Sequence, residues 1–125
     1  MNTLNLPATK TTPAVVFDPA QRTLEFSGQS YPENAIQFFQ EIQKQLEDHL
    51  KKHSDPLTVN FKLDYFNTSS SKCLLDLLEC LAQSHQKHNN ITINWYYAEG
   101  DEDMQDSGTD FSLDVKLPFN LIENK

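Results

Sequence analysis

Between Leu57 and Leu81 a strand pattern, a hydroxyl-rich turn and a helix pattern follow one another directly, and this succession constrains the fold most. Apolar and polar residues first alternate with the period of two that is typical of a strand with one buried face. Leucines then recur at helical spacing. The alternating apolar residues are Leu57, Val59, Phe61, Leu63 and Tyr65, and the helical leucines are Leu74, Leu77, Leu78 and Leu81.

The turn between these two patterns, residues 65–72, reads Tyr-Phe-Asn-Thr-Ser-Ser-Ser-Lys. A short side-chain oxygen at the start of a helix accepts a hydrogen bond from a free amide of the first turn. Asn67, Thr68, Ser69 and Ser70 each fit this capping role. The sequence therefore predicts a strand-to-helix turn and leaves its cap open among four residues.

The residues before this unit predict an arm and a hairpin. Residues 1–12 are rich in Thr and Pro without sustained periodicity, which indicates an extended or loosely held arm. The apolar run 14–17, a turn at 18–21 and the alternating stretch 22–27 predict two antiparallel strands. We expect Gly28 to end the second strand.

A long helix is predicted next. Ser30 and Glu33 have the spacing of a capping box, with Pro32 in the first turn. Basic residues 51–53 suit the negative end of the helix dipole, and Ser54-Asp55-Pro56 stops the helix. Its expected apolar stripe consists of Ile36, Phe39, Ile42, Leu46 and Leu50, widened by Phe38.

The C-terminal half predicts further alternation of helices and strands. The leucine-rich helix is expected to reach about His88, with Asn89-Asn90 as its C-terminal cap, before a strand at 91–97. The acidic segment 98–106 leads into a predicted short helix that Gly108 interrupts. A last strand covers 116–122, with Leu117, Phe119 and either Leu121 or Ile122 as its apolar positions.

This order predicts a small single α/β domain over residues 1–125. Strands separated by helices imply right-handed crossovers into a mostly parallel sheet. We therefore expect a mostly parallel sheet with an N-terminal hairpin, two long helices and a short third helix.

Charge and composition narrow the functions. A formal net charge of −8 disfavours nucleic acid and anionic membranes, whose phosphates need neutralising. No apolar run approaches the roughly 20 residues of a membrane span, and the start does not resemble a signal peptide. Cys73 and Cys80 lie about 10 Å apart along the predicted helix, too far to bridge. We expect a cytoplasmic protein with free thiols.

Sequence signals for catalysis, metals and cofactors are weak. Gly-rich phosphate loops and the G-x-S-x-G elbow are absent. A nucleophile at Thr68 or Ser70 would lack a nearby base, so we expect no catalytic residue and no enzyme. The remaining candidates are possible metal ligands. For the histidines at helix ends we favour an interaction with the helix dipole, and for the acidic residues we favour a solvated or protein-docking surface. They are His49 with His53, His85 with His88, and Asp101, Glu102, Asp103 and Asp106.

Thr68 fits a phosphate acceptor better than a nucleophile. A phosphate adds about −1.5 to −2 charges, and at a helix N-terminus the free amides and the dipole favour an anion. The same charge would penalise a partner that needed this turn desolvated or brought carboxylates to it. The sequence thus predicts a switch by modification.

Several short motifs, in order along nearly the whole chain, resemble the SiaC-like regulatory phosphoproteins. They are Thr12-Pro13, residues 30–34 (Ser-Tyr-Pro-Glu-Asn), the turn 65–72, Trp95-Tyr96-Tyr97, residues 101–104 (Asp-Glu-Asp-Met) with Asp110-Phe111, and Pro118-Phe119. The resemblance implies a fold like the anti-sigma-factor antagonist (STAS-like) domains.

The same resemblance implies a partner-switching role in cyclic-di-GMP signalling and biofilm regulation. In that family a serine/threonine kinase phosphorylates the threonine of the turn, which implies Thr68 in this sequence, and a PP2C-type phosphatase removes the phosphate. The unphosphorylated form binds and activates a diguanylate cyclase. The neighbouring residues expected to contact partners are Asn67, Ser69, Ser70, Ser71 and Lys72.

An alternative is a small-molecule or anion-binding STAS-like module, with the helix N-terminus at Ser69 to Ser71 as its anion site. A hydrolase that uses Thr68 or Ser70 is the third class, and it lacks an oxyanion motif.

Overall fold

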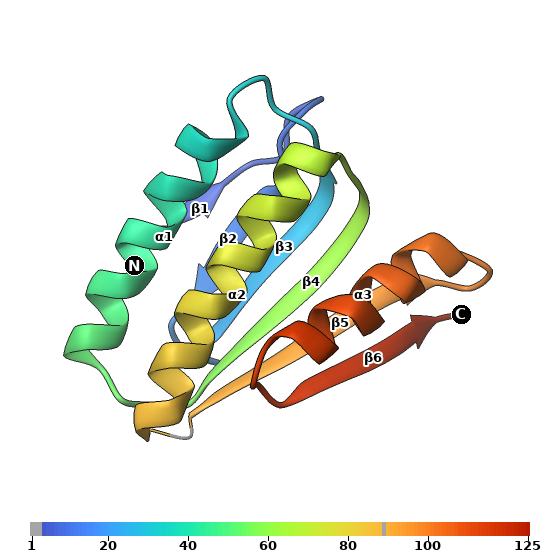
Figure 1. Ribbon diagram of the computed structural model, residues 1–125. Coiled ribbons are helices and arrows are strands. Elements are labelled where there is room, and N and C mark those ends of the chain that lie inside the picture. The colour runs from blue at the N-terminus through green and yellow to red at the C-terminus, as the bar shows by residue number, and fades with distance from the viewer. Residues whose placement is uncertain (1–3, 89) are drawn as a thin grey trace.

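The computed structural model describes residues 4–88 and 90–125, and within them the chain forms six strands and three helices (Figure 1). In chain order these are β1 (Asn5–Leu6), β2 (Ala14–Asp18), β3 (Thr23–Ser30), α1 (Ala35–Lys52), β4 (Leu57–Phe66), α2 (Thr68–His88), β5 (Ile91–Ala98), α3 (Glu102–Asp114) and β6 (Phe119–Asn124). No helix within these described residues is long and apolar enough to cross a bilayer.

All strands belong to one sheet, in the order β1-β2-β3-β4-β5-β6. β1, β2 and β3 pair antiparallel, and β3 to β6 pair parallel. A helix connects each of the parallel strands to the next. The three helices lie on one face of the sheet (Figure 1). The predicted mostly parallel α/β domain with an N-terminal hairpin is confirmed.

The arm is partly docked against the hairpin. Asn5 and Leu6 pair with Val16 and Val15, and Leu4 is buried. The part of the predicted arm at residues 1–3 lies outside the described residues.

The predicted end of the second hairpin strand at Gly28 is wrong. β3 continues to Ser30, and the sheet register shifts between Gly28 and Gln29. Gly28 has a φ of 102°, which glycine adopts without the steric cost of a Cβ. β3 therefore continues past this irregularity, and its last residue, Ser30, lies next to the turn that follows β4.

The predicted capping box of α1 is wrong. Ser30 remains in β3, and the helix starts at Ala35, where the Asn34 side chain accepts a hydrogen bond from the amide of Gln37 at 3.0 Å. The segment between them carries the chain from the sheet to the helix layer, which delays the helix by one turn.

Alternation predicted most of the core. Leu57, Val59, Phe61 and Leu63 of β4 are buried, whereas Tyr65 is 51% exposed. The pairing of β4 with β3 skips Asp64, and after this irregularity Phe66 takes the inward position and packs against Trp95 and Phe111. Ile36 is 63% exposed, and Ala35 takes the buried position instead. The buried stripe of α1 comprises Ala35, Phe39, Ile42, Leu46 and Leu50.

The third helix is longer than predicted, and Gly108 lies within it. A Cβ at this position would come within 2.6 Å of Leu121 Cδ2 and 2.7 Å of Trp95 Nε1. Trp95 Nε1 donates to the Met104 carbonyl at 3.0 Å, which ties α3 to β5. Gly108 is therefore a close-packing position and not a helix breaker.

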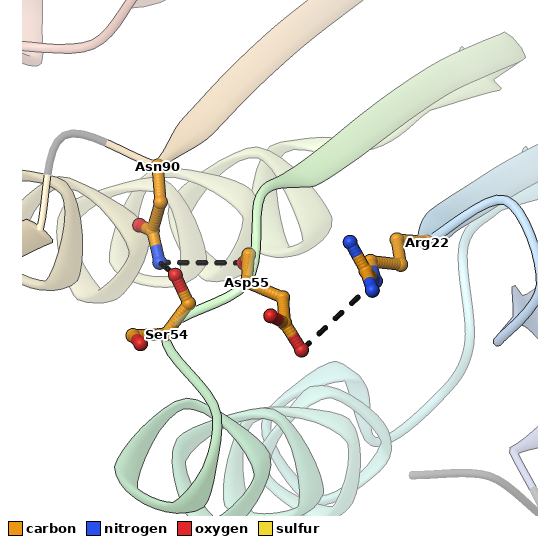
Figure 2. Close-up of polar contacts among 4 residues, drawn as sticks. All are labelled: Arg22, Ser54, Asp55 and Asn90. Atoms are coloured by element: carbon orange, nitrogen blue, oxygen red, sulfur yellow. Dashed lines mark hydrogen bonds and ion pairs between the residues drawn. The ribbon is translucent and has the colours of Figure 1, made fainter.

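The loop between α1 and β4 is tied to the start of β5 (Figure 2). Asn90 Nδ2 donates to the carbonyls of Ser54 and Asp55 at 3.0 and 3.4 Å. Asn90 therefore bridges two connections, and no contact of the described residues tests its predicted role as a cap of α2. The other half of that prediction, position 89, lies outside the described residues.

On the face of the sheet opposite the helices, the parallel strands carry a row of polar side chains. Asn94 Nδ2 donates to Asn60 Oδ1, and Asn120 Nδ2 donates to Asn94 Oδ1, both at 3.0 Å. These three residues occupy the same register position on β4, β5 and β6. A row of side-chain amides thus crosses the parallel part of the sheet.

Candidate functional site

The hydroxyl-rich turn lies where β4 ends and α2 begins, at the carboxyl end of the parallel strands (Figure 1). Ligand and partner sites of α/β sheets are commonly built at this end. The Asn67 side-chain oxygen accepts from the Ser70 amide at 3.0 Å, and its carbonyl accepts from the Ser71 amide at 2.9 Å. Among the four residues that the sequence left open, Asn67 is the cap.

Thr68 is the first residue of α2, and its side chain is exposed. Ser69 and Lys72 are also exposed, and Ser71 is half-buried. Ser70 points inward and is 0% exposed. The structure thus brings the exposed predicted residues together around Thr68, and it removes Ser70 from the contact surface.

Two buried hydroxyls hold the turn to the end of β3. Ser70 Oγ lies 2.8 Å from Ser30 Oγ, and both residues are fully buried. The Asn67 amide donates to the Ser30 carbonyl at 3.1 Å. Sequence reasoning missed this role of Ser30, because the two serines are 40 positions apart and no local pattern links them.

The first turn of α2 favours an anion. It contains no acidic residue. Asn67 engages the amides of Ser70 and Ser71, so the remaining first-turn amides are those of Thr68 and Ser69, which have no intrahelical acceptor. A negative group on the Thr68 side chain would meet the positive end of the helix dipole.

A groove of about 720 Å³ runs between α1 and α2, and Ser69 and Lys72 line the end of it nearest Thr68. Exposed Ile36 lines the groove from α1. Its charged lining residues are the carboxylates Glu33, Glu47, Asp76 and Glu79 and the ammonium groups Lys44 and Lys72. The groove is therefore acidic overall, with a cation beside the turn.

Both cysteines are free thiols, as predicted. Burial, followed by the Glu47 charge, raises the pKa of Cys80 to about 12, and its Sγ lies 3.6 Å from Glu47 Oε1. Burial also raises the pKa of Cys73. Neither thiol is set up as a thiolate nucleophile at neutral pH.

The histidines and the acidic segment that the sequence offered as metal ligands make contacts within the fold. Asp101 caps α3 by accepting from the Met104 amide at 3.1 Å. The His49 and His53 rings lie 4.6 Å apart, and His85 Nδ1 accepts from the Ile91 amide. In the described part of the chain, no group of three or more His, Cys, Asp or Glu side chains is placed to hold a metal ion.

Known proteins resemble this chain over nearly its whole length. The sequence model of the SiaC family, described as SiaC family regulatory phosphoprotein, matches residues 6–124. An uncharacterized protein of Pseudomonas aeruginosa (strain UCBPP-PA14) is 33% identical over 121 residues, which cover 97% of this chain and 96% of the relative.

Solved structures of SiaC from Pseudomonas aeruginosa share the fold. SiaC in the crystal structure of the diguanylate cyclase SiaD with its activator SiaC is 31% identical, with a TM-score of 0.90 and coverage of 97% of this chain and 99% of that one. Apo-SiaC is also 31% identical, with a TM-score of 0.89 and coverage of 98% and 99%.

Proposed function

Because this chain belongs to the SiaC family of regulatory phosphoproteins, we propose that Thr68 is its phosphoacceptor and that its unphosphorylated form binds and activates a diguanylate cyclase. The protein acts as a non-enzymatic partner switch in cyclic-di-GMP signalling. A serine/threonine kinase adds the phosphate, and a PP2C-type phosphatase removes it.

The exposure of Thr68 at the first position of α2 carries this proposal. A kinase needs a hydroxyl that reaches solvent, which Thr68 has and Ser70 lacks. The absence of acidic residues in the first turn supports the same choice, because nothing there repels the phosphate.

The cyclase partner is supported by the relative that was crystallised with SiaD as its activator. We assign Asn67, Ser69, Ser71 and Lys72, which surround Thr68, to the partner surface. A phosphate would change the charge of this surface and its cost of desolvation, so the modified form releases the cyclase. The kinase, the phosphatase and the cyclase act on nucleotides or phosphoproteins, and these substrates are found in the cytoplasm. We therefore place the switch in the cytoplasm.

Phosphorylation is tested by incubating the protein with its cognate kinase and ATP and mapping the phosphate by mass spectrometry. We expect one phosphate on Thr68 and none on Thr68→Ala. Ser69→Ala is the matched control, because it removes the adjacent exposed hydroxyl and should be modified normally. Normal modification of Thr68→Ala would refute the assignment.

Activation is tested by measuring cyclic-di-GMP synthesis by the cyclase with the unmodified and the phosphorylated protein. We expect stimulation by the unmodified form, and its loss on phosphorylation and recovery with the phosphatase. Equal stimulation by both forms would contradict the switch.

A further inference from the structure

We propose that Lys72 is the group for which the phosphate on Thr68 and a carboxylate of the cyclase compete. This inference rests on the proposed function and adds the residue that converts modification into release. It concerns the end of the groove between α1 and α2 that Ser69 and Lys72 line.

Phosphorylation acts here through side chains, because the backbone of the turn is fixed. The Asn67 amide donates to Ser30, the Asn67 side chain caps the Ser70 amide, and the buried Ser70 hydroxyl contacts Ser30. Rearrangement of the turn would break these contacts together. The responding groups must therefore be exposed side chains next to Thr68.

Lys72 is a cation within reach of such a phosphate. It lies four residues after Thr68 on the same helix, and side chains at this spacing are neighbours, about 5–6 Å apart at Cβ. Its side chain is exposed. Among the described residues the ion pairs are Arg22 with Asp55 and Lys62 with Glu25, so Lys72 is in neither.

The sign of the electrostatic effect indicates what the partner brings. The groove has four carboxylates and two ammonium groups, so a basic partner segment would bind more tightly after phosphorylation. Release requires the opposite charge near Thr68. A carboxylate of the cyclase that pairs with Lys72 in the unmodified complex meets this requirement, because the phosphate then takes its counter-charge and repels it.

The intramolecular pair is tested without kinase or cyclase, on protein with phosphothreonine incorporated at position 68 during translation. Phosphorus NMR follows the second pKa of the phosphate, ordinarily about 6. We expect this pKa to be about 0.3 lower in the protein that retains Lys72 than in Lys72→Gln, as for a helical ion pair at this spacing. The matched control is Lys44→Gln, which removes the groove's other cation. An equal phosphate pKa with and without the Lys72→Gln substitution would overturn the proposal.

The partner half is tested by titrating the cyclase with unmodified and phosphorylated protein. We expect Lys72→Gln to weaken binding of the unmodified form about fivefold and to shrink the effect of phosphorylation, whereas Lys72→Arg and Lys44→Gln retain both. Unchanged binding and unchanged release in Lys72→Gln would overturn the competition. Failure of the wild-type protein to bind the cyclase would instead refute the proposed function and, with it, the partner half.

Discussion

The hydroxyl oxygens of Ser30 and Ser70 lie 2.8 Å apart in a site closed to solvent, joining the end of β3 to the first turn of α2. Each is the hydrogen-bond partner of the other. This pair holds the backbone from which Thr68 is presented.

Replacing Ser70 by Ala should lower the free energy of unfolding by about 1–3 kcal/mol, because the buried Ser30 hydroxyl loses its partner. Denaturant unfolding measures the change. The double variant with Ser30→Ala should cost clearly less than the sum of the two single changes, since no unpaired hydroxyl remains. Strict additivity would show that the two hydroxyls are not coupled.

Asn67→Ala should destabilise the protein by about 0.5–2 kcal/mol, because the Ser70 amide loses the side-chain oxygen that caps it. Asn67→Asp keeps an acceptor at this position and is the matched control. Thermal unfolding compares the two variants, and equal melting temperatures for Ala and Asp would argue against a capping role.

Gly108→Ala should destabilise the fold, although alanine normally stabilises a helix interior by about 1 kcal/mol relative to glycine. The new methyl group would collide with Trp95 and Leu121, and such overpacking costs about 1–3 kcal/mol. Thermal unfolding followed by Trp95 fluorescence measures the change. The exposed substitution Gln105→Ala on the same helix should be nearly neutral, and stabilisation by Gly108→Ala would contradict the packing.

Thiol reactivity should report the environment of Cys80. With a pKa raised to about 12, the thiol carries little thiolate at pH 8 and should react slowly with Ellman's reagent. Removing the adjacent carboxylate in Glu47→Gln lowers the thiol pKa and should speed labelling. Both measurements use Cys73→Ser, so that one thiol is followed, and an unchanged rate would exclude the Glu47 contribution.

The sequence predicted the helices and strands that bury a regular apolar pattern. β4, α2 and β5 follow from alternation and from helical leucine spacing, because burial of one face dictates those periods. The resemblance and the turn chemistry together indicated Thr68 before any contact was known.

Several predictions failed, most of them where contacts between residues distant in the sequence determine the structure. The pattern placed Ile36 in the core, but Ala35, four residues before Phe39, lies on the buried stripe of α1 and Ile36 faces away from it. Gly108 was predicted to interrupt the helix, because the local sequence does not show that Trp95 and Leu121 of β5 and β6 pack against it. Ser30 had the spacing of a cap, yet its hydroxyl belongs to a contact with α2 that only the sheet order creates.

The row of amides formed by Asn60, Asn94 and Asn120 selects one alignment of the parallel strands. A slip of β5 by one residue would break both amide contacts and turn buried Ile93 and Trp95 toward water. Polar and apolar side chains on opposite faces thus impose the same strand alignment, which fixes where β4 ends and therefore where the turn that carries Thr68 begins.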